Sequence, residues 1–133
     1  MARRESGFTL TEVLITIVVL AVLAGLAMPN YFLTVEKSRS NEAVANLNVI
    51  RMGERIYKLN NGRYWPNPDS ADSTLADINT NLNVDLDTRY YNTITVTTTG
   101  TGTAYTAVAA RGNSGNKTFT IDQSGTITES GTY

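Results

Sequence analysis

An apolar run from Phe8 to Met28 dominates the N-terminal part of this 133-residue chain. Glu12 is the only charged residue within it. Wound as an α-helix, a run of this length extends roughly 31 Å, about the thickness of the hydrocarbon core of a bilayer. With the amphipathic residues that follow, one helix from Phe8 to Leu59 would have 52 residues and a length of roughly 78 Å, and no compact domain of this size buries such a helix alone. The run therefore predicts a helix that needs lipid or neighbouring helices around it.

Basic residues precede the run at Arg3 and Arg4. They favour a cytoplasmic N-terminus, with the rest of the chain sent outward. Three interpretations remain open: a cleaved secretory signal, an ordinary single-span anchor, and a helix used for assembly after insertion. The stretch Ala24–Ala27 offers small residues for a signal-peptidase site, but the apolar run is long for a signal core.

Glu12 favours the third interpretation. An acidic residue inside a membrane-spanning helix costs on the order of 2.5–3.5 kcal/mol at the helix centre, and less near its end. A signal peptide or a plain anchor gains nothing from this cost. The residue is explained if a positive partner reaches it later, inside an assembly. The alternative is that Glu12 lies at the level of the lipid headgroups.

The segment Gly7–Glu12 (GFTLTE), followed by the apolar run and then Pro29, closely resembles the class III signal of type IV pilins and of type II secretion pseudopilins. In that family a short basic leader ends in Gly, and the acidic residue is fifth in the mature chain. The resemblance covers residues 1–60 strongly and the remainder in outline.

The resemblance implies a processing route and a set of partners. A prepilin peptidase would remove the leader, residues 1–7, by cutting between Gly7 and Phe8, and would methylate the new amine of Phe8. Residues 8–29 would span the inner membrane until an assembly platform and its ATPase extract the subunit into a homo-oligomeric helical filament. There Glu12 would pair with the Phe8 amine of a neighbour, so that each buried charge supplies the other's partner.

The function implied is that of a structural subunit of a type IV pilus-like filament on the cell surface. The alternative within the family is the major pseudopilin of a type II secretion system, which forms a short periplasmic filament. Outside the family, the competing hypothesis is a signal-anchored periplasmic binding module that stays uncut at Phe8. Adhesion, motility, DNA uptake and secretion belong to the whole machine, and one subunit sequence does not choose among them.

Gly25 and Pro29 mark the softest point expected in the long helix. Pro29 has no N–H to donate to the carbonyl of Gly25, its ring crowds the same turn, and Gly25 is a weak helix former. We expect a kink or a locally unwound stretch there. The alternative is a simple helix end at Asn30.

Residues 30–133 are predicted to form a soluble head, which makes the chain an α+β protein. Its long N-terminal helix, membrane-spanning in the first half and amphipathic in the second, is expected to pack against a small C-terminal antiparallel β-sheet. The amphipathic helix covers residues 30–60, a loop with one helical turn near 75–78 covers 61–89, and the sheet occupies 90–133. The strands are expected at Tyr90–Thr98, Thr103–Ala110, Lys117–Asp122 and Thr126–Thr128.

The amphipathic helix carries two neighbouring apolar stripes that are expected to meet the sheet. One stripe contains Val35, Ala43, Leu47 and Ile50, and the other contains Val49, Met52, Ile56 and Leu59. Glu54 and Lys58, four residues apart, are expected to pair on the polar side. From the strands, the expected core residues are Ile94, Val96, Tyr105, Val108, Phe119 and Ile121. Tyr64 and Trp65 are expected to seal the junction between the helix and the loop.

Composition excludes several kinds of site. The chain has no His and no Cys, which excludes His- or Cys-based nucleophile systems, zinc sites built from them, haem ligation through His, and disulfides. A net charge of −1 argues against a nucleic-acid binder. No residue set indicates catalysis or a cofactor, so we expect no enzyme activity. The acidic residues Asp77, Asp85 and Asp87 match no defined calcium loop and are expected in solvent, and Asn116 begins a formal glycosylation sequon.

Overall fold

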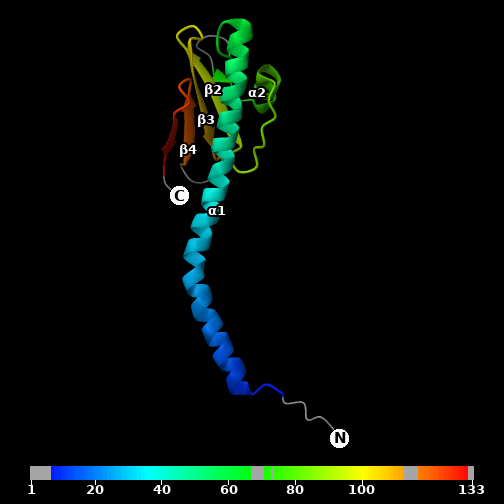
Figure 1. Ribbon diagram of the computed structural model, residues 1–133, viewed down its shortest axis with the longest axis vertical. Coiled ribbons are helices and arrows are strands. Elements are labelled where there is room, and N and C mark those ends of the chain that lie inside the picture. The colour runs from blue at the N-terminus through cyan, green and yellow to red at the C-terminus, as the bar shows by residue number, and fades with distance from the viewer. Residues whose placement is uncertain (1–6, 67–70, 73, 113–116, 132–133) are drawn as a thin grey trace. The chain divides into compact units, whose positions relative to one another are not determined.

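The computed structural model describes residues 7–66, 71–72, 74–112 and 117–131. Within these residues there are two helices and five strands: α1 (Leu10–Asn61), β1 (Ala71–Asp72), α2 (Leu75–Leu82), β2 (Thr93–Thr99), β3 (Ala104–Ala110), β4 (Thr118–Asp122) and β5 (Ile127–Ser130) (Figure 1). The predicted α+β class is confirmed. The chain divides into two compact units, residues 1–35 and 36–133, which are described separately.

The first unit is helical over its described length beyond Thr9. Helix α1 passes through Pro29 without interruption, so the alternative in which the helix ends at Asn30 is wrong. The helix contains a stretch that is long and apolar enough to cross a membrane, and none of that stretch is buried. A softening of the helix at Gly25 and Pro29 stays a prediction.

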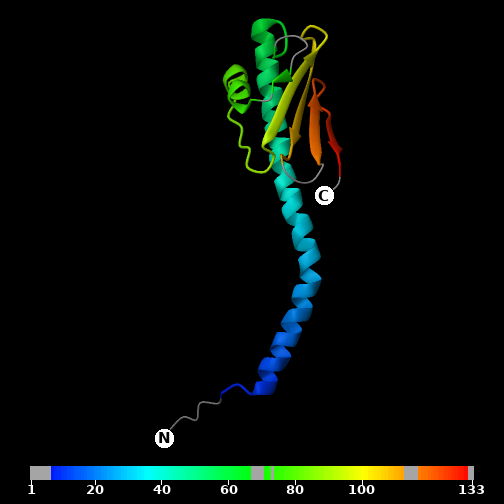
Figure 2. The same cartoon turned by 180° about the vertical axis from the view of Figure 1, so that it is seen from behind.

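In the second unit, α1 lies against a face of the sheet (Figures 1 and 2). Its buried residues recur at three- and four-residue steps, as expected for one helix face. They are Ser40, Ala43, Asn46, Leu47, Ile50, Gly53 and Glu54. The first predicted stripe is therefore confirmed from Ala43 to Ile50.

The second predicted stripe is wrong in most of its members. Val49 is partly buried against the core. Met52, Ile56 and Leu59 are 66%, 57% and 85% exposed. The sheet covers only one side of the helix, and these three side chains point away from it. The periodicity identified a helix but could not say how wide its covered face would be.

The sheet is an antiparallel meander in the order β1-β2-β3-β4-β5, each strand pairing with the next along the chain. The four predicted strands correspond to β2–β5, whereas β1 falls in a segment predicted to be loop. The predicted turn near 75–78 is the start of α2. The turn between β2 and β3 uses positive φ angles at Gly100, Thr101 and Gly102, which explains its glycines.

One strand of the core differs from the prediction. Successive side chains of a strand alternate between its faces, so Tyr105 and Val108, three positions apart, cannot share one. Tyr105 is buried with Ala107 and Ala109, and Val108 lies on the opposite face. The other predicted core residues of the strands are buried, as are Tyr64 and Trp65 at the junction. Asn116, of the predicted sequon, lies outside the described residues.

Candidate assembly site

The N-terminus of α1 is closed by a reciprocal cap between Thr9 and Glu12. The amide N and the Oγ1 hydroxyl of Thr9 donate to Glu12 Oε2 at 3.2 and 3.0 Å. In return, the amide of Glu12 donates to Thr9 Oγ1 at 3.2 Å. This is a capping box, in which a Thr and a Glu three residues later satisfy each other's free amide groups. The T-x-x-E spacing could have revealed it from the sequence, and our prediction missed it.

Three of the predicted site residues meet at this cap. Gly7, Phe8 and Glu12, together with Thr9, line one shallow pocket. Both bonds from Thr9 go to Oε2, and Oε1 of Glu12 accepts no hydrogen bond from any described residue. That oxygen is available to a cation from outside the subunit. Gly25 and Pro29, the other predicted residues, lie further along α1 and are not part of this pocket.

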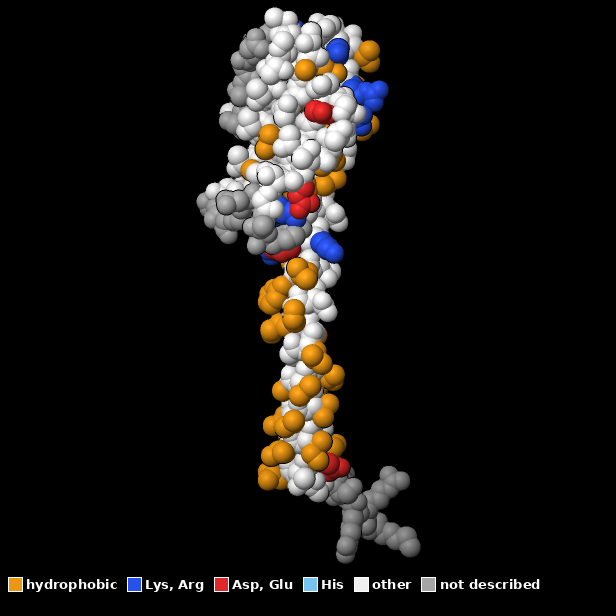
Figure 3. Space-filling view, turned by 90° about the vertical axis from the view of Figure 1, so that its left-hand side faces the viewer, with side chains coloured by type: hydrophobic (Ala, Val, Ile, Leu, Met, Phe, Trp, Pro, Cys, Tyr) orange, Lys and Arg blue, Asp and Glu red, His pale blue; other side chains and the backbone are white. Residues whose placement is uncertain are grey.

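The helix that follows the cap is exposed on all sides. Every large apolar side chain from Phe8 to Leu33 is between 49% and 88% exposed. Figure 3 shows such side chains spread along the helical stretch next to the N-terminus. Exposed apolar patches of this extent mark a membrane or protein contact, because their exposure to water is unfavourable by about 25 cal/mol per Å².

The second unit contains a buried carboxyl group that sequence reasoning placed wrongly. Glu54 was expected on the polar face beside Lys58, but its exposed fraction is zero. Its Oε2 accepts the Trp65 amide N–H at 3.0 Å, while Oε1 is buried without a partner among the described residues. Burial raises the pKa of Glu54 to about 7, and the Trp65 hydrogen bond offsets only part of this shift.

Lys58 contacts an aromatic ring instead of Glu54. Its Nζ lies 4.2 Å from the ring centroid of Tyr64, which is a cation–π distance. The Tyr64 ring in turn lies 4.8 Å from that of Tyr105, centroid to centroid. The end of α1 is thus joined to the sheet through aromatic contacts, as expected for the seal at this junction.

Nothing in the described part of the chain resembles a catalytic or metal centre. Among those residues, no group of three or more acidic, His or Cys side chains could hold a metal ion. Asp77, Asp85 and Asp87 are exposed, as predicted. The distinctive feature of the described residues is the capped apolar helix, which is suited to insertion into a membrane or to packing against other helices.

An exposed apolar helix that begins at a capped acidic residue and continues into an α+β head defines a class of membrane-anchored subunits. Residues 2–28 match the family described as the prokaryotic N-terminal methylation motif. With the relatives given below, this match shows that the N-terminal segment is similar to that of type IV pilins and pseudopilins.

Several relatives carry the same name. The chain is 44% identical over 73 residues to the type II secretion system core protein G of Aeromonas hydrophila, covering 55% of this chain and 51% of that protein. It is 42% identical over 64 residues to the protein of the same name from Dickeya chrysanthemi, covering 48% and 42%. For Pectobacterium carotovorum the identity is 35% over 88 residues, covering 66% and 54%.

The chain thus spans about half the length of the curated relatives it matches. No solved structure matches it significantly. The similarity therefore supports the resemblance of the N-terminal segment to the family, while the roles of its residues and the activity and partners of the whole protein are matters for proposal.

Proposed function

We propose that this chain is a structural subunit of a type IV pilus-like filament, polymerised through its N-terminal helix. The proposal rests on the capped helix, whose large apolar side chains from Phe8 to Leu33 are each at least 49% exposed. Lipid covers such a helix before assembly, and sibling helices can cover it afterwards. The head, which packs its own core, remains soluble at the other end of the chain.

Processing would prepare the helix for assembly. A prepilin peptidase at the inner membrane would cut between Gly7 and Phe8 and methylate the Phe8 amine. An assembly platform and its ATPase would then lift the subunit from the membrane into the filament. The matched motif, whose description names N-terminal methylation, supports this route.

In the filament, the Phe8 amine of one subunit would approach the Glu12 carboxylate of another. Oε1 of Glu12 is the oxygen available for that contact, since the cap uses Oε2. In a dry helix bundle an unpaired charge is strongly penalised, whereas a hydrogen-bonded ion pair is tolerated. The pairing would therefore fix where each new subunit joins the growing end.

The second candidate is the major pseudopilin of a type II secretion system, which forms a periplasmic filament. The relatives named type II secretion system core protein G favour it. Both candidates share the inner-membrane precursor and the peptidase step. They differ in the location of the filament, on the cell surface or in the periplasm, and not in the structure of the subunit.

Intact-mass and N-terminal analysis tests the proposal on protein sheared from the cell surface and on the membrane fraction. A chain starting at methylated Phe8 in the sheared fraction supports a surface filament. The same processed chain confined to the membrane and periplasm supports the pseudopilin. An uncut chain, or one cut after Ala27, contradicts both and supports a signal-anchored binding module.

A further inference from the structure

The last turns of α1 expose an apolar strip on the head. Met52, Ile56 and Leu59 are spaced four and three residues apart, which places them on one face of the helix. All three are more than half exposed, and together they form what we call the outer stripe. Earlier in the head, the corresponding outward positions are polar or small: Ser38, Asn41, Ala45 and Asn48. The outer stripe is therefore a local feature of the helix end.

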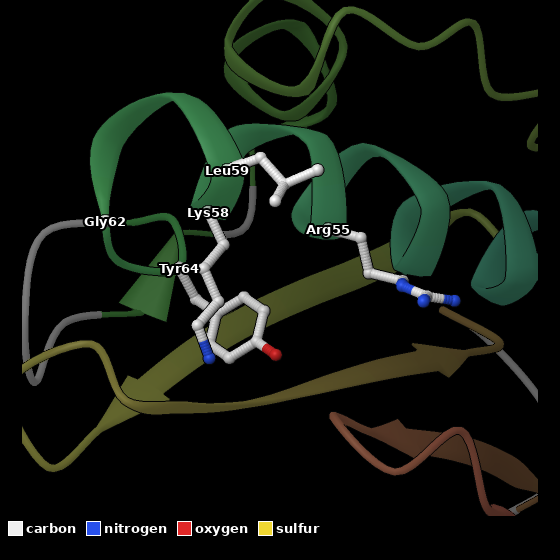
Figure 4. Close-up of a pocket in the computed structure, with 5 residues that line it drawn as sticks. All are labelled: Arg55, Lys58, Leu59, Gly62 and Tyr64. Atoms are coloured by element: carbon white, nitrogen blue, oxygen red, sulfur yellow. The ribbon is translucent and has the colours of Figure 1, made fainter.

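Positive charge borders the outer stripe on one side. Arg55, Lys58 and Arg63 are exposed, and we call them the basic flank. Arg55 and Lys58 line a shallow pocket with Leu59, Gly62 and Tyr64 (Figure 4). Arg55 forms no ion pair or hydrogen bond with any described residue, and Glu54 cannot neutralise the flank because it is buried.

Negative charge lies on another part of the head. Asp77 on α2, and Asp85 and Asp87 on the loop after it, are exposed, and we call them the acidic flank. Within residues 74–89, Arg89 is the one cation, so the segment is net negative. The carboxylates of Asp85 and Asp87 pair with no cation among the described residues.

The two flanks lie on opposite sides of α1. A Cβ on Gly53 would touch Leu82 and Val84, so the segment bearing the acidic flank packs at Gly53. Arg55 is two residues further on, about 200° around the helix. On that side, Arg51 donates to the Ser124 carbonyl at 3.0 Å, near β4. Figures 1 and 2 agree, with α2 on one side of α1 and the β4 end of the sheet on the other.

We propose that the head contains the two halves of a head-to-tail contact, in which the basic flank of one copy docks on the acidic flank of the next copy, with the outer stripe packed at its edge. A helical filament requires a contact between two different patches of the subunit, because only such a contact repeats without closing. This inference rests on the proposed filament function and assigns the head a part in it. Opposite charges also select the register of the incoming subunit.

Paired cysteines test the contact in the full-length protein in cells, since the chain has no native cysteine. Arg55→Cys combined with Asp85→Cys in one chain should give a ladder of multimers with a short bismaleimide, because each copy offers both halves of the contact. Each single variant should give no ladder. Lys37→Cys with Asp85→Cys is the matched control, since Lys37 is an exposed cation on the same helix 18 residues earlier. A ladder from the control pair but not from Arg55 and Asp85 overturns the proposal.

Charge reversal gives an independent measurement. Arg55→Glu alone and Asp85→Arg alone should each lower the number of filaments by about tenfold, because like charges then face each other at every contact. The double variant should restore filaments, because the contact is rebuilt with its charges exchanged. Wild-type filaments with no ladder and no effect of reversal overturn this contact while leaving the filament function intact. The absence of wild-type filaments contradicts the filament function itself.

Discussion

Oε2 of Glu54 accepts the amide N–H of Trp65 at 3.0 Å, joining a helix residue to the backbone eleven positions later. Glu54 is wholly buried and Trp65 is 6% exposed. The bond holds the segment that leaves α1 back against that helix, while the ring contact of Tyr64 with Tyr105 joins the segment to the sheet. A carboxyl group at the centre of this junction makes the stability of the head depend on pH.

The head should lose stability as pH rises from about 4.5 to about 7. Burial raises the pKa of Glu54 to about 7 from the usual 4.5, so in this window the folded state binds more protons than the unfolded state. The free energy of unfolding then falls with rising pH, by an amount on the order of 3 kcal/mol. Chemical denaturation of the full chain in detergent, at several pH values, measures how steeply the free energy of unfolding falls with pH.

Glu54→Gln is the control for this slope. The amide oxygen can still accept the Trp65 N–H, but the side chain does not titrate. The variant should show little pH dependence between 4.5 and 7 and should be more stable than wild type at pH 8. The lowered pKa values of Glu36 and Asp122 act below about pH 4.5, outside the window. An unchanged slope in the variant would show that another group is responsible.

Two substitutions at Glu12 separate its capping role from its charge. Glu12→Gln keeps an acceptor for Thr9 but removes the charge, and we expect processed, membrane-bound subunits without filaments. Glu12→Ala removes both roles and should give the same result. Thr9→Ala keeps the charge and loses the cap, at about 1 kcal/mol, so filaments should persist in reduced number. Electron microscopy of sheared fractions counts them. Abundant filaments from Glu12→Gln would refute the charge pairing.

Pro29 should leave a weak point in α1 even though the helix is continuous. The carbonyl of Gly25 has no amide donor at position 29, so the turn between them should open more readily than its neighbours. Pro29→Ala restores the donor and should slow amide hydrogen exchange in residues 25–33 of the detergent-solubilised chain. Exchange in α1 between 43 and 50 serves as the internal reference. Equal exchange in the two proteins would argue against a soft point.

Gly53 should tolerate no side chain. An added Cβ would lie 2.9 Å from Leu82 Cβ and 3.0 Å from the Leu82 carbonyl oxygen, so α2 would have to move. Gly53→Ala should therefore destabilise the head by about 1–3 kcal/mol in denaturant unfolding. Gly25→Ala on the same helix is the matched control, because nothing lies within 4 Å of its added Cβ. Equal changes in the free energy of unfolding for the two variants would contradict the claim that close packing at Gly53 excludes a side chain.

The sequence was most informative where a pattern has one solution. The long apolar run predicted a helix that needs lipid or neighbouring helices around it, and the Thr-rich segments separated by Gly turns predicted neighbouring antiparallel strands. Prediction from the sequence failed where contacts between elements decide which side chains are buried. Tyr105 and Val108 cannot share a face of β3, and the buried face holds Tyr105 with Ala107 and Ala109. Met52 and Glu54 exchanged their expected environments because the sheet covers only part of the helix.

Trp65 is the single tryptophan of the chain, and its indole is buried beside the Glu54 junction. Its fluorescence therefore reports on one place only, the seal between α1 and the sheet. A subunit in a micelle could lose this signal while α1 residues 10–33 remain helical in the apolar phase. Emission and circular dichroism, recorded on the same sample, would then separate melting of the head from loss of the helix without any added label.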